Sequence, residues 1–494
     1  MKRGLSFLVV FAFVSVAFTA TLPLSVFHYN DEHSMNLPQP TKNPETGKID
    51  SIGGIQYIAG QLAVWRKDAK RSITLVAGDE FTGGAISALT KGSGQADILN
   101  LIKPDVMCVG NHEFDYGISA LQAFQFRLDT SITLASANLF DKVNNKQLFA
   151  SGKIIKRDGI KIAVLALTLE GLADVVHPDR LIDIEVQPVV PIARAFVEKM
   201  QPDADVIIAV THQGAVEDSL LAMQVPGFDL IVGGHSHTLI NRDWFVNGTR
   251  IVQAGSSGRY LGRVDLQVDT ENNEVVSSTY KVVPIGKSYR TPMDPKAIPI
   301  LRAQEVLVSK ELDQPLGKLD GDFIRVYDGE SNVGTWVCEA LQSYMKTDIG
   351  LYNSGGIRVD VFAGTITKKQ LWQLEPFGNS IAKATVTGAE LKRMFEYRAT
   401  VEGDFIQTSG VTVTIKSGQV TDLTVNGVAF DPAKIYSIAT NSYVTAQWEK
   451  YFGFPLGQSN VVDMGTPTKE VLMLDIEAKK TIVPHVTGWW KKSE

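Results

Sequence analysis

The sequence predicts an α/β fold arranged in two domains, and three observations lead to this prediction. Short apolar runs bounded by glycine or polar residues alternate with stretches of helical spacing, as buried strands and covering helices do in an α/β sheet. Polar residues that can bind metal ions follow five of these runs. The 494 residues, of which 44% are hydrophobic, are enough to build more than one sizeable core.

Each of the five apolar runs is predicted to form a strand, and a polar motif follows each strand. Loops after the carboxyl ends of strands form the ligand crevice of an open α/β sheet, so all five motifs are expected to face one site. In chain order the pairs are Leu24–Phe27 with Asn30-Asp31-Glu32-His33, Ile73–Ala77 with Gly78-Asp79, Val106–Val109 with Gly110-Asn111-His112-Glu113-Phe114-Asp115, Val206–Val210 with Thr211-His212, and Leu230–Val232 with Gly234-His235-Ser236-His237.

The residue types in these motifs indicate a two-metal phosphoester hydrolase. Imidazole suits Zn and other first-row metals, whereas carboxylate and amide oxygens suit harder ions such as Mn. Two ions about 3.5–4 Å apart can clamp the oxygens of an in-line displacement. We therefore expect two divalent metal ions (Zn, Mn or Co). Of the 8 histidines, only His28, His177 and His485 lie outside the motifs, and these are interpreted as structural.

The elements after the last motif indicate where the first predicted domain ends and the second begins. A β-rich stretch from Arg250 to Val283 follows the last motif, and the apolar spacing between Asp294 and Leu312 predicts a connecting helix. We expect a signal peptide at residues 1–20, a catalytic domain at 21–290, a linker helix at 291–312 and a substrate-binding domain at 313–494.

The first twenty residues have the layout of a secretory signal peptide, with Lys2 and Arg3 before the apolar stretch Leu5–Phe18 and small residues after it. An uncleaved membrane anchor is the alternative, but the stretch is short for a spanning helix. No second apolar stretch follows. The mature protein is expected to be periplasmic or secreted, without stable membrane insertion.

The charge of the chain limits the kinds of partner it is expected to bind. The 48 basic and 54 acidic residues give a net charge of −6 without a long run of either sign, which does not favour nucleic-acid or anionic-membrane binding. The substrate is expected to be a small molecule, and the oligomeric state is not predicted.

Cys108 and Cys338 fall in different predicted domains, so two buried free thiols are expected even though export would permit a disulfide.

From about Leu24 to the C-terminus, the motifs resemble those of the calcineurin-like metallophosphoesterases, and more closely the 5'-nucleotidases and UDP-sugar hydrolases. The resemblance implies a two-sheet α/β sandwich followed by a mixed α/β domain that closes over the substrate. It implies that Asp79 bridges the metals and that His112 and Asp115 form the catalytic pair. It places Asp31, His33, Asp79 and His237 around one metal, and Asp79, Asn111, His212 and His235 around the other. Other members carry Gln at the position of His237.

The second domain carries segments that match substrate-binding segments of that family: Asn353-Ser354-Gly355-Gly356-Ile357-Arg358 and Glu375-Pro376-Phe377-Gly378-Asn379. The resemblance implies that Asn353 and Arg358 contact base or phosphate and that Phe377 and Tyr443 sandwich the base. Asn379 belongs to the same set, and Arg325 is the candidate for a further family arginine.

The largest departure from the family follows Tyr443. Members that bind ribose have Gly-Gly-Asp there, whereas this chain reads Ala446-Gln447-Trp448-Glu449. Ungapped counting places Glu449 at the ribose-binding position, but the loss of both glycines must change the turn.

The sequence therefore predicts a secreted phosphohydrolase that releases phosphate from nucleotides, with UDP-sugars or nucleotide polyphosphates as further substrates. One alternative keeps the metal chemistry and changes the substrate, as in a 2',3'-cyclic nucleotide phosphodiesterase or a thiosulfohydrolase. The other is a nucleotide-binding protein without turnover.

Overall fold

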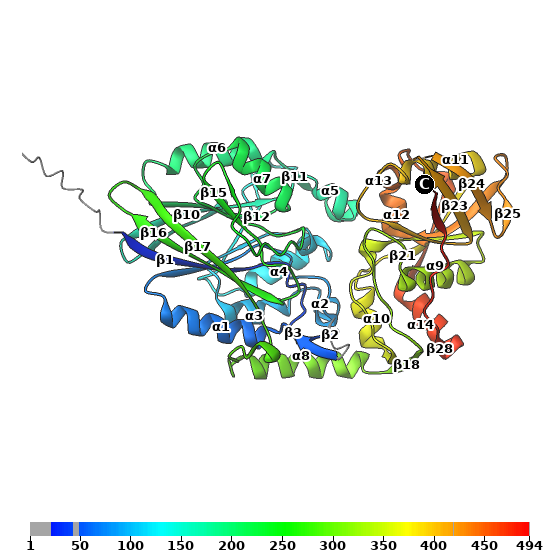
Figure 1. Ribbon diagram of the computed structural model, residues 1–494, viewed down its shortest axis with the longest axis horizontal. Helices are drawn as coiled ribbons and strands as arrows, with labels where there is room; N and C mark the ends of the chain where they lie inside the picture. Colours follow the sequence, from blue (N-terminus) through cyan, green and yellow to red (C-terminus); the bar gives the residue numbers. More distant parts are fainter. Residues whose placement is uncertain (1–20, 43–48, 418, 494) are drawn as a thin grey trace, which may run out of the picture.

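The computed structural model describes residues 21–42, 49–417 and 419–493, and the predicted signal peptide lies outside them. The described chain forms an N-terminal lobe and a C-terminal lobe (Figure 1). Helix α8 (Ala297–Leu312) runs beneath the first lobe and leads into the second. This helix falls in the segment whose apolar spacing predicts one.

The N-terminal lobe contains two six-stranded sheets. The first has the order β17-β16-β1-β4-β5-β6, and the second has the order β14-β15-β13-β12-β10-β9. The strands of the first sheet are β17 (Glu274–Pro284), β16 (Tyr260–Asp269), β1 (Leu22–Tyr29), β4 (Ser72–Val76), β5 (Val106–Cys108) and β6 (Thr133–Ala135). Those of the second are β14 (Phe245–Val246), β15 (Thr249–Val252), β13 (Leu230–Val232), β12 (Val206–His212), β10 (Ile160–Thr168) and β9 (Gly152–Arg157).

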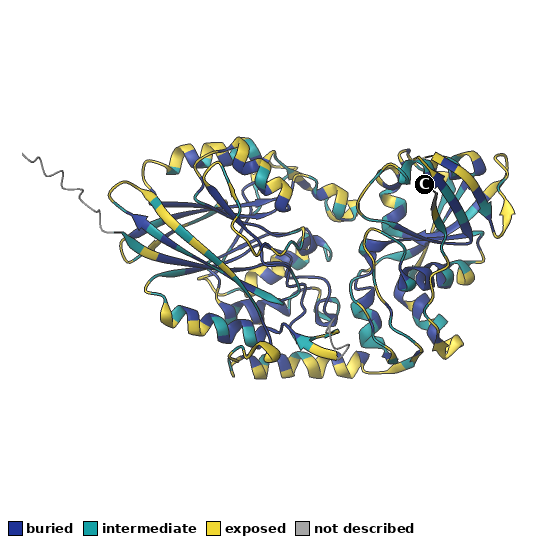
Figure 2. Cartoon of the chain, viewed as in Figure 1, coloured by how far each residue is buried: buried dark blue, intermediate teal, exposed yellow. Residues whose placement is uncertain are grey.

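The two sheets pack face to face, with helices on their outer sides. One apolar core, which includes Val26, Leu75, Val164 and Val210, fills the space between the sheets, and Figure 2 shows the buried strands at the centre of the lobe. The predicted two-sheet α/β sandwich is therefore confirmed. Covering helices on the first sheet are α1 (Ile55–Asp68), α3 (Gln95–Ile102) and α4 (Ile118–Arg127), and those on the second are α6 (Val189–Met200) and α7 (Ala215–Gln224).

Strand direction determines where the polar motifs emerge. Strands β1, β4 and β5 are parallel to one another, and so are β10, β12 and β13. Their carboxyl ends therefore open at a common edge of each sheet, which is where ligands bind in open α/β sheets. The five polar motifs follow β1, β4, β5, β12 and β13, and each predicted apolar run is a strand.

The C-terminal lobe is a mixed α/β domain, as predicted. Its central five-stranded sheet separates two apolar cores, and successive residues of one strand point alternately into them: Leu351 into one and Tyr352 into the other. The strands of this sheet are β22 (Ile406–Ser409), β19 (Ile349–Asn353), β26 (Ile435–Asn441), β21 (Ser380–Thr387) and β27 (Val461–Pro467). The helices are α9 (Asn332–Met345), α10 (Lys368–Leu374), α11 (Gly388–Arg398), α12 (Ser442–Ala446), α13 (Trp448–Phe452) and α14 (Thr468–Lys479).

Two smaller sheets complete this lobe. One pairs β20 (Gly364–Thr367), β18 (Pro315–Leu319) and β28 (Thr481–Ile482), and the other pairs β25 (Val428–Ala429), β24 (Gln419–Val425), β23 (Val411–Lys416) and β29 (Trp490–Ser493).

Local signals explain where several helices of this lobe begin. The Ser331 hydroxyl accepts a hydrogen bond from Gly334 N at the start of α9. Helices α10 and α11 each begin with a capping box, formed by Thr367 with Gln370 and by Thr387 with Glu390. Such caps satisfy N–H groups that have no partner within the helix.

The predicted state of the two cysteines is confirmed, because Cys108 and Cys338 are both free and buried.

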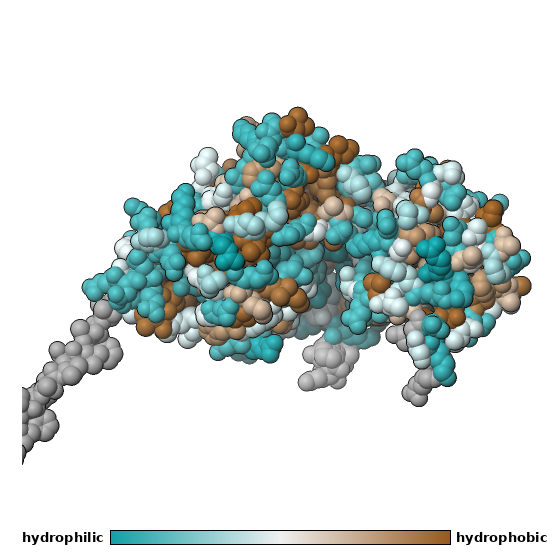
Figure 3. Space-filling model, turned by 90° about the horizontal axis from the view of Figure 1, so that it is seen from above, coloured by the Kyte–Doolittle hydropathy of each residue, from teal (hydrophilic) through white to brown (hydrophobic). Residues whose placement is uncertain are grey.

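Within the described residues, no helix combines the length and the apolar character needed to cross a bilayer. Seen from above, hydrophilic residues cover much of both lobes, with apolar residues in small groups between them (Figure 3).

Candidate active site

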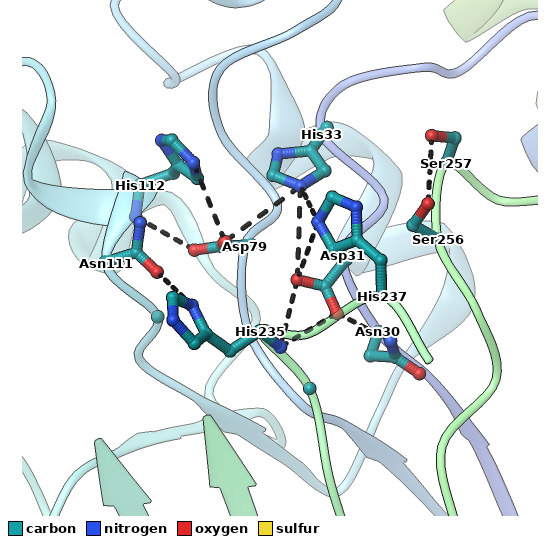
Figure 4. Close-up of polar contacts among 12 residues, drawn as sticks. Asn30, Asp31, His33, Asp79, Asn111, His112, His235, His237, Ser256 and Ser257 are labelled. Atoms are coloured by element: carbon teal, nitrogen blue, oxygen red, sulfur yellow. Dashed lines mark hydrogen bonds and ion pairs between the residues drawn. The ribbon is translucent and has the colours of Figure 1, made fainter. Parts of the chain in front are cut away.

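The five polar motifs converge at the carboxyl edge of the two sheets. Figure 4 shows side chains of four of these motifs, which point toward one another. The loops that present them are sharply bent. Asp31, His33, Asp79, His235 and His237 all adopt positive φ, between 52° and 76°. Residues other than glycine seldom adopt this conformation, which costs about 1–3 kcal/mol each and tends to concentrate at functional sites.

The first group comprises Asp31, His33 and His237. The ring Nε2 atoms of His33 and His237 lie 3.0 Å apart, and His237 Nε2 is 3.4 Å from Asp31 Oδ1. The other Asp31 oxygen accepts a hydrogen bond of 2.6 Å from Asn30 Nδ2, which fixes the carboxylate. The ligand atoms of this group all lie within 4.8 Å of one another, close enough to share one cation.

The second group comprises Asp79, Asn111, His212 and His235. Asp79 Oδ2 is 3.1 Å from His212 Nε2, and Asn111 Oδ1 lies 3.1 Å from His212 Nε2 and 2.9 Å from His235 Nδ1. Asp79 Oδ2 also lies 4.0 Å from His33 Nε2. The Asp79 carboxylate is therefore positioned between the two groups.

Backbone carbonyls set the protonation of two of these rings. His212 Nδ1 is 2.6 Å from Ala77 O, and His33 Nδ1 is 2.9 Å from Thr82 O. A carbonyl oxygen can only accept, so each Nδ1 must donate. In the neutral ring this leaves the Nε2 lone pair facing the other ligands, as metal-binding histidines require. The donor set of these two groups therefore fits divalent metal ions.

Burial and neighbouring charges also shift the pKa values of these groups. Burial lowers the pKa of His33 well below its usual range, with a further contribution from Arg358, and burial lowers the pKa of His235 to about 4. Burial acts to raise the pKa of Asp79, but the imidazoles of His212 and His112 outweigh it and hold the pKa well below its usual range. His212 is shifted the other way: burial acts to lower its pKa, but the Asp79 carboxylate outweighs burial and raises the pKa to about 10. Because imidazoles bind metals in the neutral form, metal binding would release the proton from this ring.

His112 differs from the other four histidines of the motifs because its Nδ1 is held by a carboxylate that belongs to neither ligand group. Its Nδ1 lies 2.7 Å from Asp115 Oδ2, one turn further along a short 3₁₀ helix, while its Nε2 points toward Asp79 Oδ2 at 3.9 Å. Burial acts to lower the pKa of His112, but the carboxylates of Asp115 and Asp79 raise it above its usual value. The ring can thus carry a proton on the nitrogen that faces the site.

Sequence reasoning did not single out Glu113, although it lies inside a quoted motif. Its buried carboxylate accepts hydrogen bonds from the backbone N–H groups of Gly110, Asp79, Glu80 and Phe81, at 2.6, 3.0, 2.8 and 3.2 Å. It therefore holds the Asp79 loop against the Asn111 loop. No spacing signal in the sequence distinguishes such a backbone acceptor from a ligand.

A cavity of about 1200 Å³ extends from the ligand groups to the C-terminal lobe. Asp79, Asn111, His112, His235 and His237 line one side of it. Six of the seven substrate-binding residues expected from the sequence line it as well: Arg325, Asn353, Arg358, Phe377, Asn379 and Tyr443. His177, interpreted from the sequence as structural, also lines the cavity and caps a 3₁₀ turn by accepting from Asp179 N.

Arg358 connects the two lobes at the metal-ligand end of the cavity. Its guanidinium Nη2 lies 3.3 Å from His33 Nε2, and its central carbon is 5.8 Å from the Phe377 ring centroid. The Phe377 ring in turn lies 5.8 Å from that of His112. A fixed guanidinium beside the ligand groups is suited to bind an anionic group such as phosphate.

The structure does not bring Glu449 to this cavity. Trp448 lies in the apolar core with 2% of its surface exposed, whereas Glu449 is exposed on α13 and is absent from the cavity lining. The two glycines of the family loop are replaced by residues that continue into a short helix anchored by this Trp, so ungapped counting along the chain does not reach the cavity. The carboxylate that lines the cavity nearby is Asp404, which belongs to none of the motifs recognised in the sequence.

Comparison with known proteins agrees with the fold. The calcineurin-like phosphoesterase profile matches residues 24–239, and the 5'-nucleotidase C-terminal domain profile matches residues 315–454. The chain belongs to the 5'-nucleotidase family of metallophosphoesterases. Membership makes it a metal-dependent phosphoester hydrolase.

Relatives within this family match along most of the chain. Protein UshA of Yersinia enterocolitica is 28% identical, over 86% of this chain and 85% of its own length. The 5'-nucleotidase of Vibrio cholerae is 26% identical, over 94% and 91%. The crystal structure of a 5'-nucleotidase precursor from Thermus thermophilus superposes with a TM-score of 0.86 at 23% identity, covering 95% of this chain and 99% of that one, which shows a shared two-lobed fold.

Proposed function

We propose that this chain is an exported 5'-nucleotidase that releases phosphate from nucleotides at a two-metal site. The observation that supports this most strongly is the meeting of both ligand groups and the Arg358 guanidinium at one end of a cavity whose other wall is the C-terminal lobe. The names of the matched relatives support the nucleotide as substrate. Hydrolysis of UDP-sugars or nucleotide polyphosphates is part of the same proposal.

In this proposal four residues of the chain would hold each metal ion, and Asp79 would belong to both sets. When bound, two divalent ions would supply Lewis-acid stabilisation of charge on the transferring phosphoryl group. Nitrogen and oxygen ligands in this mixture suit Zn, Mn or Co. The two sets are Asp31, His33, Asp79 and His237, and Asp79, Asn111, His212 and His235.

The His112–Asp115 pair is proposed to handle charge and the proton. Asp115 holds Nδ1–H, so the ring presents Nε2–H toward the reacting group. That proton can stabilise charge on the phosphoryl oxygens or pass to the leaving oxygen of the nucleoside. Arg358 adds fixed positive charge on the cavity side of His33.

The C-terminal lobe is proposed to hold the nucleoside. Phe377 and Tyr443 supply aromatic rings to the cavity, and stacking on a base is worth about 1–3 kcal/mol without reading much of its identity. Asn353, Asn379 and Arg325 supply polar groups along the same wall. The sequence prediction of export, together with the absence of basic runs, supports a periplasmic or secreted enzyme acting on small molecules.

Hydrolysis of a substrate panel tests this function, measured as phosphate release from AMP and ATP and as formation of the cleavage products from UDP-glucose and the two diesters, whose first hydrolysis releases no phosphate. Purified mature protein would be stripped with a chelator, reloaded with Mn, Zn or Co, and given AMP, ATP, UDP-glucose, 2',3'-cyclic AMP and bis(p-nitrophenyl) phosphate. Hydrolysis that depends on metal and is fastest with AMP or ATP is expected. Cleavage of the cyclic nucleotide or the generic diester alone would contradict a nucleotidase.

A variant of the bridging carboxylate separates turnover from mere binding. Asp79→Asn removes the charge shared by both ligand sets, so we expect loss of activity with every substrate of the panel. Unchanged turnover in this variant would show that the ligand groups do not carry the reaction.

A further inference from the structure

Asp404 is held in the cavity wall by the segment that carries the substrate-binding residues. It lies between α11 and β22, and its Oδ1 accepts a hydrogen bond of 2.6 Å from Gly355 N. Its Oδ2 accepts hydrogen bonds from Tyr451 Oη at 2.5 Å and from Asn353 Nδ2 at 3.3 Å. The carboxylate is thus fixed by three donors.

These contacts leave the carboxylate with capacity for one more donor. A carboxylate offers about four lone-pair sites, two on each oxygen. Oδ2 has two partners and Oδ1 has one among the described residues, so one site on Oδ1 remains. Because a carboxylate only accepts, the ligand group that fills this site must be an N–H or O–H donor.

The surroundings of Asp404 favour a neutral donor over a cation. Arg398 donates from Nη2 to the backbone oxygen of Asp404 at 2.8 Å. The ammonium of Lys450 lies on the same cavity wall and feels both the Asp404 and the Arg398 charges. A ligand cation would be repelled by Arg398 and Lys450, whereas a hydroxyl would not.

The position of Asp404 along the cavity points to the sugar of a nucleotide. Gly355 and Asn353, which hold it, belong to the same loop as Arg358, whose guanidinium lies beside the ligand groups. Tyr443, which also lines the cavity, has its ring 6.3 Å from that of Tyr451, which donates to Asp404. Asp404 therefore lies between the phosphate end of the cavity and an aromatic ring suited to a base, where the ribose of a bound nucleotide would be.

Two other carboxylates compete for this role less well. Glu449, which ungapped counting suggests, is exposed and lies off the cavity. Asp463 lines the cavity, but it is exposed and its Oδ1 accepts from Gly465 N in its own turn. Among the described residues, neither forms a hydrogen bond or an ion pair with the loop that carries Asn353 and Arg358.

We propose that Asp404 is a specificity-determining residue whose Oδ1 accepts a hydrogen bond from one ribose hydroxyl of the nucleotide substrate. This inference rests on the nucleotidase function proposed above. It implies that the carboxylate that selects ribose in this chain comes from the turn before β22. The segment after Tyr443, which holds the ribose-binding residue in the family, forms helix α13 here.

The test compares kcat/KM for AMP, 2'-deoxy-AMP and 3'-deoxy-AMP, each divided by the rate with p-nitrophenyl phosphate, which has no ribose. In the wild type, AMP should be preferred over one deoxy analogue by roughly 10- to 100-fold, the range for a hydrogen bond to a charged group. Asp404→Ala should remove this preference. Asp404→Asn, which keeps an acceptor oxygen but loses the charge, should reduce it part of the way.

Control variants separate a specific role of Asp404 from a general effect of charge on the cavity wall. Asp463→Asn makes the same change of charge on the same wall and should retain the wild-type preference. Equal use of all three nucleotides by the wild type, an undiminished preference in both Asp404 variants, or loss of the preference in Glu449→Gln would each overturn the role of Asp404. Cleavage of p-nitrophenyl phosphate without any hydrolysis of AMP would instead refute the nucleotidase function.

Discussion

His112 has its two ring nitrogens directed at different groups, since Nδ1 faces Asp115 and Nε2 faces the cavity. The ring therefore need not bind a metal ion in order to act in the reaction. We expect His112→Gln to retain the bound metal and to lower kcat by roughly 10²–10⁴, the usual contribution of a positioned acid or base. Metal content by plasma emission spectrometry and turnover with AMP would be measured together. Loss of metal in parallel with activity would reassign His112 as a ligand.

Asp115 raises the pKa of His112, and this predicts a shift in the pH profile. If the protonated ring is the active form, activity falls as pH rises through the His112 pKa. Asp115→Asn removes a neighbouring negative charge, so the alkaline limb of kcat should move to lower pH by about one unit or more. Metal content measured at each pH provides the control. An alkaline limb at the wild-type pH would show that it reports another group.

Site residues could be predicted from the sequence where several of them lie in one short motif. Asn111, His112 and Asp115 lie within a span of five residues that follows one strand, so their residue types and their spacing together indicated a site. Asp404 stands alone in a turn and acquires its place only when α11 and β22 bring it beside Gly355. Glu449 is a residue that the sequence placed wrongly. Its assignment to the ribose-binding position assumed that the segment is a loop as in the family, whereas Trp448 is buried in the core and the segment forms a short helix.

At the scale of elements, the strands were predictable and the bends after them were not. Apolar runs identify β1, β4, β5, β12 and β13 because buried parallel strands read as continuous hydrophobic stretches. The positive φ of Asp31, His33 and His237 is not encoded by glycine at these positions. Contacts from neighbouring loops, such as His235 N with the Asp31 carboxylate at 3.1 Å, hold these bends, and they exist only in the folded chain.

Glu113 is the best test of how the loops support one another. Glu113→Ala would leave four buried N–H groups without their acceptor, and we expect a loss of at least about 4 kcal/mol in the free energy of unfolding, since each orphaned group costs about 1–3 kcal/mol. Metal affinity should fall as well, because the Asp79 loop is released. Urea denaturation would measure the first effect and metal titration the second.

The exposed Glu311 on α8 offers a matched control for this variant. Glu311→Ala removes the same side chain from the surface and should change stability by less than about 0.5 kcal/mol. If the two variants unfolded at the same urea concentration, the proposed clamp of the Asp79 loop would be refuted.

For the whole molecule, the sequence predicts two domains but not how they face each other. Besides the contact through Arg358, contacts between the lobes include two places: where α10 packs against α8, and where α12 and α13 meet α5 (Leu172–Val175) (Figure 1). At the second place, carbonyl oxygens at the end of α5 accept from Tyr443 Oη, Gln447 Nε2 and Lys450 Nζ at 3.0, 2.6 and 2.6 Å. The segment that departs from the family thus supplies contacts between the lobes.

These contacts predict that Gln447 and Lys450 favour the closed arrangement of the lobes. The double variant Gln447→Ala, Lys450→Ala removes two hydrogen bonds, each worth about 0.5–1.5 kcal/mol, and also removes a positive charge from the carboxyl end of α5. We expect the radius of gyration from small-angle X-ray scattering to increase, because the contacts that remain, near α8 and through Tyr443 and Arg358, would hold the lobes together less firmly. Glu449→Ala, in the same short helix but with its side chain exposed, should scatter as the wild type does. An unchanged radius of gyration in the double variant would mean that the contacts near α8 and through Tyr443 and Arg358 are sufficient to hold the lobes together.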